Sequence, residues 1–341
     1  MMREPAFWWR DPGIAARLLA PAGALYGAVA QARLRRRGRR AAAPVICIGN
    51  LTIGGAGKTP LALATGRMFK NAGELPVFLT RGYGGALAGP IEVDPLAHTA
   101  KDVGDEALLL AHVAPTIVAR ARLAGAALAS SENVIVMDDG FQNPTLRKDI
   151  SLLVVDERRG IGNGRVFPAG PLRVPLAAQL ARAHALILVG PPASGAGVAA
   201  QARSHGLPVV RAHLQPDEEF IAALGRGRVL AFAGIGDPEK FFATLKAAGV
   251  SVGMKRPFPD HHCYTRAQAQ ALCEDADREG LVLVTTEKDL ARLRGDSEVA
   301  ELTDHAHALP VTLAFEQEDA FRLFLLEQLA AARGTHRNRR N

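Results

Sequence analysis

Short, mainly apolar runs alternate with segments of helical apolar spacing along most of the chain. Each run has the length of a strand and is bounded by glycine, proline, polar or acidic residues, which is typical of strands in a buried parallel sheet. Strands that alternate with helices in this way predict an α/β fold with a largely parallel sheet. In the first part of the chain the runs cover residues 44–48, 76–80, 134–137, 150–155, 185–189 and 208–214.

The same pattern restarts near residue 225. Strands are predicted at 228–233 and 281–286, a helix begins near 238, and an amphipathic helix over 319–332 closes the chain. No period repeats, which indicates a second α/β unit and not a repeat array. We therefore expect four segments, namely an N-terminal segment 1–40, a first unit 41–222, a smaller second unit 223–330 and a basic tail 331–341.

The N-terminal segment combines aromatic and aliphatic residues at near-helical spacing with a following run of arginines. Arg17 and Pro21 interrupt it, so it lacks the roughly twenty strongly apolar residues of a spanning helix. We predict an amphipathic helix in a membrane interface, with aromatics at the headgroups and arginines beside anionic lipid. The alternative is a helix packed on the protein with solvated arginines. The apolar residues are Phe7, Trp8, Trp9, Ile14, Leu18, Leu25 and Val29.

The charge distribution limits the expected partners. The 341 residues carry a net charge of +7, but ten arginines lie in residues 33–40 and 333–340, so the remainder is slightly acidic. A basic platform for nucleic acid is therefore not expected. The cysteines Cys47, Cys263 and Cys273 have no metal-ligand spacing, and we expect them to be small core residues in a reducing cytoplasm.

A glycine-rich segment follows the first predicted strand and precedes apolar helical spacing over 61–69. This order is that of a phosphate-binding loop, in which backbone N–H groups and a helix N-terminus hold a phosphate. Lys58 is placed to reach the outer phosphates, and Thr59 to bind Mg²⁺ through its hydroxyl. The usual first glycine is replaced here by Thr52, and a simple glycine-rich turn is the alternative. The predicted nucleotide-binding residues are Thr52, Ile53, Gly54, Gly55, Ala56, Gly57, Lys58 and Thr59.

Two acidic pairs lie where a parallel sheet presents the carboxyl ends of its strands. Asp138 and Asp139 end the strand at 134–137 and are the expected Mg²⁺-side complement of the phosphate loop. A plain turn is the alternative. Asp105 and Glu106 open a helix, where acidic residues are often only partners of the helix dipole. The functional alternative makes one of them a base and its neighbour a metal-side carboxylate.

Other polar residues lie in loops that can face the same crevice. Arg81 and Tyr83 follow the strand at 76–80, where they can contact a phosphate or stack on a ligand. Arg173 lies in a long glycine- and proline-rich passage, and such loops are often functional. Each of these three residues can equally be a surface residue. His261 belongs to an Asp-His-His segment of the second unit that can face the nucleotide, and an ordinary surface pair of histidines is the alternative. Adjacent histidines diverge too far for a two-ligand zinc site.

One segment bears on the choice of nucleotide. Residues 286–289 read Thr-Glu-Lys-Asp, which has the composition of a guanine-selecting motif with its lysine displaced. ATP is therefore favoured over GTP. Residues 234–236 read Gly-Ile-Gly without the third glycine of a dinucleotide fingerprint, and we expect a loop there.

Several segments, taken together and in order, resemble the tetraacyldisaccharide 4′-kinase family of lipid A biosynthesis from about residue 5 to residue 330. The resemblance implies transfer of the ATP γ-phosphoryl group to the 4′-hydroxyl of a tetraacylated glucosamine disaccharide 1-phosphate. It also implies a P-loop domain and a second α/β domain that close over ATP and Mg²⁺. The segments are 49–60, 81–84, 104–106, 138–142, 168–173, 260–262 and 285–289.

The resemblance further implies partners and residue roles. The N-terminal helix would dock peripherally on the anionic cytoplasmic face of the inner membrane, where the lipid substrate lies. Asp105 looks like the catalytic base, with His261 as its partner from the second domain and Lys58 at the phosphates. The expected metal-side residues are Thr59, Glu106, Asp138 and Asp139, and the expected substrate contacts are Arg81, Tyr83, Gln142 and Arg173.

Two positions depart from the family's pattern. Asn143-Pro144 stands where His usually follows, and Val174 stands where Glu often follows the arginine. The first leaves open the role of the loop beyond Gln142, and the second removes an acidic contact outside the phosphoryl-transfer centre. The alternatives to a kinase are a P-loop regulator or metallochaperone at the membrane, and a non-enzymatic basic protein that binds membrane or RNA.

Overall fold

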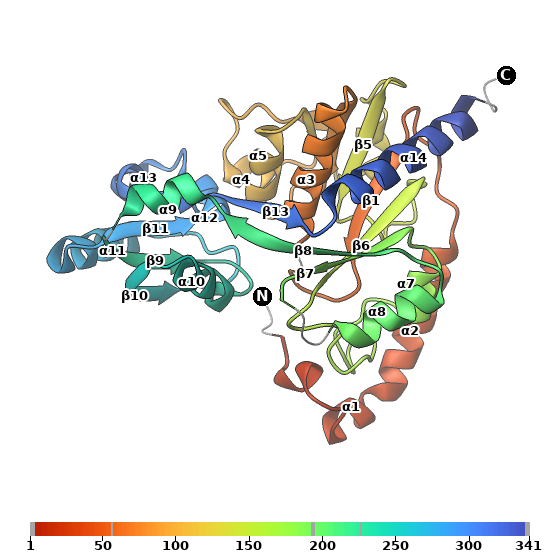
Figure 1. The fold of residues 1–341 in the computed structure, drawn as a ribbon, viewed down its shortest axis with the longest axis horizontal. Helices are drawn as coiled ribbons and strands as arrows, with labels where there is room; N and C mark the ends of the chain where they lie inside the picture. Colours follow the sequence, from red (N-terminus) through yellow and green to blue (C-terminus); the bar gives the residue numbers. More distant parts are fainter. Residues whose placement is uncertain (1–3, 56, 192–194, 226, 338–341) are drawn as a thin grey trace.

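The computed structural model describes residues 4–55, 57–191, 195–225 and 227–337. Ala56 of the predicted phosphate loop and residues 338–341 of the predicted tail lie outside them. Two α/β units lie side by side, each built on its own sheet (Figure 1). The α/β fold predicted from the apolar runs is confirmed.

The larger unit contains a nine-stranded sheet that is parallel except for its two edge strands. Strand β1 is central, and Ile48 of β1 lies opposite Asp138 of β5, so the phosphate loop and this carboxylate leave the sheet together. Across the sheet the strands are β13 (Val311–Phe315), β8 (Val209–Pro216), β7 (Ala185–Val189), β6 (Ile150–Asp156), β1 (Val45–Asn50), β5 (Asn133–Asp138), β2 (Leu75–Thr80), β4 (Thr116–Val118) and β3 (Ile91–Glu92).

Helices cover both faces of the larger sheet, because successive residues of each buried strand point to opposite sides. Ile46 and Ile48 pack on one face with Phe69, whereas Val45 and Cys47 pack on the other. One face carries α3 (Lys58–Asn71), α5 (Asp105–Ala111) and α14 (Glu318–Arg337), and the other carries α2 (Ala20–Arg35), α6 (Arg122–Ala126), α7 (Leu176–Leu180) and α8 (Ala196–Ser204). The short α4 (Ala100–Val103) precedes α5.

The smaller unit has a four-stranded parallel sheet in the order β10-β9-β11-β12. Its helices also pack on both faces. The strands are β9 (Arg228–Ala233), β10 (Ser251–Pro257), β11 (Val282–Thr286) and β12 (His307–Leu309). The helices are α9 (Glu218–Leu224), α10 (Pro238–Ala247), α11 (Arg266–Glu279), α12 (Glu287–Leu293), η2 (Ser297–Val299) and α13 (Ala300–His305).

The end of the chain returns to the larger unit, which changes the predicted segments. Strand β13 pairs antiparallel with β8 and forms with it a two-stranded link between the units (Figure 1). Helix α14 then packs Phe321 and Leu325 into the core of the larger sheet. Residues 311–330 therefore join the larger unit in space, although we assigned 223–330 to the second. The predicted tail is helical to residue 337, and its Arg333 pairs with Glu74.

At the N-terminus, η1 (Ala6–Trp9) and α1 (Ile14–Leu18) lead into α2. Helix α2 lies close to the larger unit through its glycines: a Cβ at Gly23 would come within 2.9 Å of the carbonyl oxygen of Val166. Leu25 and Val29 point outward, with exposed fractions of 71% and 54%, whereas Leu34 near the end of the helix is buried. Within the described residues no helix has the length and apolar character needed to cross a membrane.

Two residue-level expectations are wrong. Trp8 was expected to lie among lipid headgroups, but its side chain is buried in the protein and its Nε1–H donates to the carbonyl of Pro168 at 3.0 Å. Cys263 is exposed in the loop after His262, whereas Cys47 and Cys273 are buried as expected.

Candidate active site

The phosphate loop lies between β1 and α3, as the sequence predicts. Gly54 and Gly57 have φ values of +102° and +89°, which is backbone that favours glycine, and α3 begins directly after Gly57. The Asn50 side chain donates to the carbonyl of Gly54 at 2.8 Å. Thr52 instead forms a β-bridge with Leu172 and is not left-handed, so glycine is not needed there.

The acidic pair at the end of β5 divides into two environments. Asp138 is buried, and neither of its carboxylate oxygens has a hydrogen-bond partner among the described residues. Burial, reinforced by the charge of Glu106, raises the pKa of Asp138 to about 7. Asp139 is partly exposed, with Lys58 at 3.9 Å and Arg173 at 3.5 Å. Although burial opposes its charge, these two cations lower the pKa of Asp139.

The acidic pair at the start of α5 faces the same space. Asp105 is buried, and its Oδ1 accepts the backbone N–H of Glu106 at 2.8 Å. The Thr59 hydroxyl donates to Oε1 of Glu106 at 3.2 Å, which links α5 to the phosphate loop. The second of these contacts places Glu106 beside Thr59 at the start of α3.

The second unit completes the site. His261 Nδ1 lies 3.5 Å from Oδ2 of Asp105, and its ring lies 4.9 Å from that of Tyr83. The backbone of His261 is left-handed with φ of +55°, a conformation that surrounding contacts must hold. The predicted meeting of Asp105 and His261, distant in sequence, is therefore observed in the geometry.

Two basic residues of α12, Lys288 and Arg292, also lie in the site, although the sequence did not indicate them as site residues. Lys288 Nζ lies 2.6 Å from Oε1 of Glu106, and Arg292 Nε lies 2.8 Å from Oδ2 of Asp105. Their spacing of four residues after a predicted strand was the available signal. This spacing does not indicate that α12 faces the larger unit.

These contacts set the protonation states. Burial disfavours the charge on Asp105, but the hydrogen bond with His261 and the charges of Lys288 and Arg292 lower the pKa of this carboxyl. The same hydrogen bond is the main cause that raises the pKa of His261, against its partial burial. Asp105 is therefore ionised at neutral pH, and His261 is a better proton acceptor than a free imidazole.

The predicted substrate contacts have different surroundings. Arg81 and Tyr83 are exposed, and the Tyr83 ring lies 4.9 Å from the ring of His261. Arg173 is bound to the phosphate loop, because its Nε–H donates to the carbonyl of Thr52 at 2.9 Å. The Gln142 side chain donates to the carbonyl of Asn50 at 3.1 Å, and thus holds the base of the loop.

The oxygen donors fit a magnesium ion. The structure holds no cluster of three or more His, Cys, Asp or Glu among its described residues that would bind a metal alone. Mg²⁺ in kinases is held by one or two carboxylates together with phosphates and water. The two unpartnered oxygens of Asp138, with Glu106 and the Thr59 hydroxyl nearby, meet that requirement.

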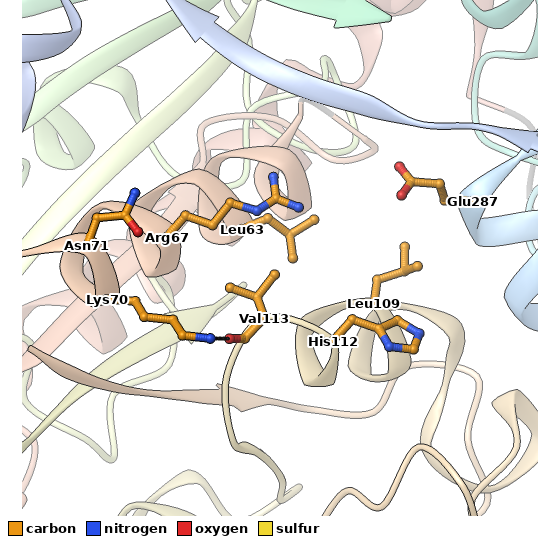
Figure 2. A pocket seen from close by; sticks show the side chains of 8 residues that line it. All are labelled: Leu63, Arg67, Lys70, Asn71, Leu109, His112, Val113 and Glu287. Atoms are coloured by element: carbon orange, nitrogen blue, oxygen red, sulfur yellow. Dashed lines mark hydrogen bonds between the residues drawn. The ribbon is translucent and has the colours of Figure 1, made fainter. Parts of the chain in front are cut away.

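A pocket of about 320 Å³ is lined by residues of α3, by the end of α5 with the residues after it, and by the start of α12. Figure 2 shows Arg67 of α3 and Glu287 of α12 on opposite sides of it. Glu287 faces this pocket whereas the next residue, Lys288, contacts Glu106, so the start of α12 separates the pocket from the site. The lining residues are Leu63, Arg67, Lys70, Asn71, Leu109, His112, Val113 and Glu287.

Comparison with known proteins decides the family. A family model described as tetraacyldisaccharide-1-P 4′-kinase matches residues 15–330. The chain belongs to this family. It is 54% identical over 334 residues to the tetraacyldisaccharide 4′-kinase of Nitrobacter winogradskyi, covering 97% of this chain and 99% of that protein. It is 55% identical over 336 residues to that of Rhodopseudomonas palustris, covering 97% of both.

A solved structure supports the same assignment. The chain superposes with a TM-score of 0.70 on a crystal structure of LpxK from Aquifex aeolicus in complex with ATP. The two are 25% identical, and the match covers 93% of this chain and 100% of the other. Family membership confirms the predicted class of an ATP-dependent kinase of lipid A biosynthesis, and the predicted P-loop α/β fold.

Proposed function

We propose that this chain transfers the γ-phosphoryl group of ATP to the 4′-hydroxyl of a tetraacylated glucosamine disaccharide 1-phosphate. The observation that carries the proposal is the contact of Asp105 with His261, 3.5 Å apart, at the sheet edge that bears the phosphate loop. A carboxylate and an imidazole at this point can accept the proton of an attacking hydroxyl. A nucleotide-binding regulator would not need this pair.

The chemistry requires positioning and charge neutralisation more than covalent participation. Lys58, at the start of α3, neutralises the outer phosphates. As the sugar oxygen attacks the γ-phosphorus, the bond to the leaving β-phosphate oxygen breaks and Asp105 takes up the hydroxyl proton. His261 Nδ1 lies 3.5 Å from Oδ2 of Asp105 and shares that proton. The imidazole therefore helps to hold a proton that Asp105 alone, with its lowered pKa, would bind weakly.

We further propose that the nucleotide binds with Mg²⁺, held by Asp138, Glu106 and the Thr59 hydroxyl. The ion would neutralise charge on the phosphates. The unpartnered oxygens of Asp138 support its role in this set. Asp139 lies against Lys58 and Arg173 and serves to hold these cations.

The lipid acceptor calls for access to a membrane. The exposed apolar residues of α1 and α2, Ile14, Leu18, Leu25 and Val29, form a surface next to the arginines of residues 33–40. We propose that this surface docks peripherally on the anionic cytoplasmic face of the inner membrane, without a nucleic-acid partner. The exposed residues Tyr83, which lies beside His261, and Arg81 are then the ones that we expect to meet the sugar and its phosphate.

A kinase assay tests the proposal. The purified chain is incubated with ATP, MgCl₂ and the tetraacyldisaccharide 1-phosphate, and the lipid is analysed by mass spectrometry. We expect an added phosphate on the lipid, and none with a Lys58→Met variant. ATP consumption that leaves the lipid unchanged would contradict the kinase and favour the P-loop regulator or metallochaperone.

A further inference from the structure

Two basic residues of α12 match two acidic residues of α5 across the boundary between the units. Lys288 and Arg292 are four residues apart and therefore lie on one face of their helix. Lys288 meets Glu106 at 2.6 Å, and Arg292 meets Asp105 at 2.8 Å. The second unit thus brings two cations as well as His261 to the start of α5.

The guanidinium of Arg292 is fixed within its own unit. Its side chain is only 8% exposed, and its NH1 donates to Oδ1 of Asp289 at 3.0 Å. Asp289 is fully buried and also accepts from the hydroxyl of Tyr264 at 2.7 Å and from the backbone N–H of Gly234 at 2.9 Å. The group that meets Asp105 therefore has a defined position, which an exposed flexible side chain would not have.

Arg292 also holds the loop that carries His261. NH1 donates to the carbonyl of Gly234 at 2.9 Å and approaches that of His262 at 3.4 Å. The backbone N–H of His261 donates to the same carbonyl of Gly234 at 3.0 Å. One side chain thus contacts Asp105, the carbonyl of Gly234 that also accepts the backbone N–H of His261, and the carbonyl of His262.

We infer that Arg292 is a positioning residue for phosphoryl transfer, an inference that rests on the proposed function. It does not touch the substrate. It fixes the carboxylate of Asp105 through Nε and the turn of His261 through NH1, so that the two groups meet. These simultaneous contacts need donors on more than one nitrogen in a fixed fork. The ammonium of a lysine keeps the charge but has its donors on a single nitrogen and can satisfy only part of them.

Steady-state kinetics of Arg292→Gln test this inference. We expect kcat to fall on the order of 10²-fold, the cost of a misplaced reacting group, while KM for ATP stays within about threefold because Arg292 does not contact the phosphate loop. Arg292→Lys should recover part of kcat. The matched control is Arg294→Gln, an exposed arginine two residues further on, which should resemble the wild type.

A double-mutant cycle separates positioning from a structural role. In an Asp105→Asn background, Arg292→Gln should lower kcat by no more than about threefold further, because Arg292 acts through Asp105 and His261. Equal losses in both backgrounds, or a loss confined to KM, would overturn the inference. If Arg292→Gln does not fold, the same cycle uses Arg292→Lys. A wild-type chain without lipid kinase activity would overturn the proposed function itself, whereas additive losses in an active enzyme overturn only the role of Arg292.

Discussion

Two neighbouring aspartates of this site have different surroundings because the backbone turns their side chains in different directions. Asp138, the last residue of β5, stays in the buried sheet edge, where its oxygens have no partner among the described residues. Asp139 takes a left-handed backbone with φ of +49° and turns toward Lys58 and Arg173. The sequence predicted the acidic pair as a unit. It did not divide the roles, because the division depends on one backbone angle.

Asp138→Asn tests the metal-side assignment. The substitution replaces a carboxylate whose two oxygens are free to bind an ion. We therefore expect the Mg²⁺-dependent affinity for ADP to fall about 10- to 100-fold, as for the loss of a charged contact. Isothermal titration with and without Mg²⁺ measures the effect. Asp139→Asn is the neighbouring comparison and should alter the metal dependence less. An unchanged Mg²⁺ dependence in Asp138→Asn would remove this residue from the metal site.

His261 provides a pH test at the same scale. Contact with Asp105 raises its pKa above the ordinary value of 6.5. The interaction therefore stabilises the folded state below pH 6.5, and this contribution is lost as the pH rises through the folded pKa. In Asp105→Asn we expect the pKa of His261 to fall relative to the wild type, because the charged partner is gone. NMR titration of the imidazole measures both values, and identical pKa values would argue against the contact.

At the scale of elements, six of the nine strands of the larger sheet and two of the four strands of the smaller sheet could be predicted, since their buried apolar runs are visible in the sequence. Strands β3, β4, β10 and β12 were not predicted. The edge strand β13 was missed, because its place depends on pairing with β8 from far along the chain. The contribution of α12 was missed for the same reason. In the sequence its basic residues are typical of a solvent-exposed helix surface. Only the tertiary structure shows that they contact the acidic residues of α5. The phosphate loop and the carboxylates could therefore be predicted from local sequence patterns, whereas the cations of α12 could be identified only from tertiary contacts.

Helix α2 allows a test of the membrane surface. It packs inward through small residues and leaves Leu25 and Val29 exposed. Leu25→Asp with Val29→Asp should strongly reduce cosedimentation with vesicles that contain anionic lipid, because charge opposes insertion into the interface. Thermal unfolding should change little, since surface substitutions have small effects. Leu323→Asp on α14, an exposed leucine of the larger unit, is the control. Equal vesicle binding by all variants would place the membrane contact elsewhere.

At the scale of the molecule, three segments meet beside the phosphate loop. Arg159, in the loop after β6, pairs with Glu4 of the N-terminal segment at 2.8 Å and stacks on Trp9 at 4.9 Å. The adjacent Arg158 pairs with Asp237 at the start of α10. The N-terminal segment, the larger unit and the second unit are therefore joined at one loop. With the contacts of α12 on α5, this makes the site a product of the whole chain and not of the P-loop unit alone.

The central claim is that Asp105 and the second unit together carry out phosphoryl transfer. The most direct measurement is the turnover of purified Asp105→Ala with ATP, Mg²⁺ and the disaccharide lipid. We predict a loss of kcat of about 10²- to 10⁴-fold, the range for a positioned general base, in a soluble protein that still binds ATP. Near-normal turnover by that soluble variant would contradict it.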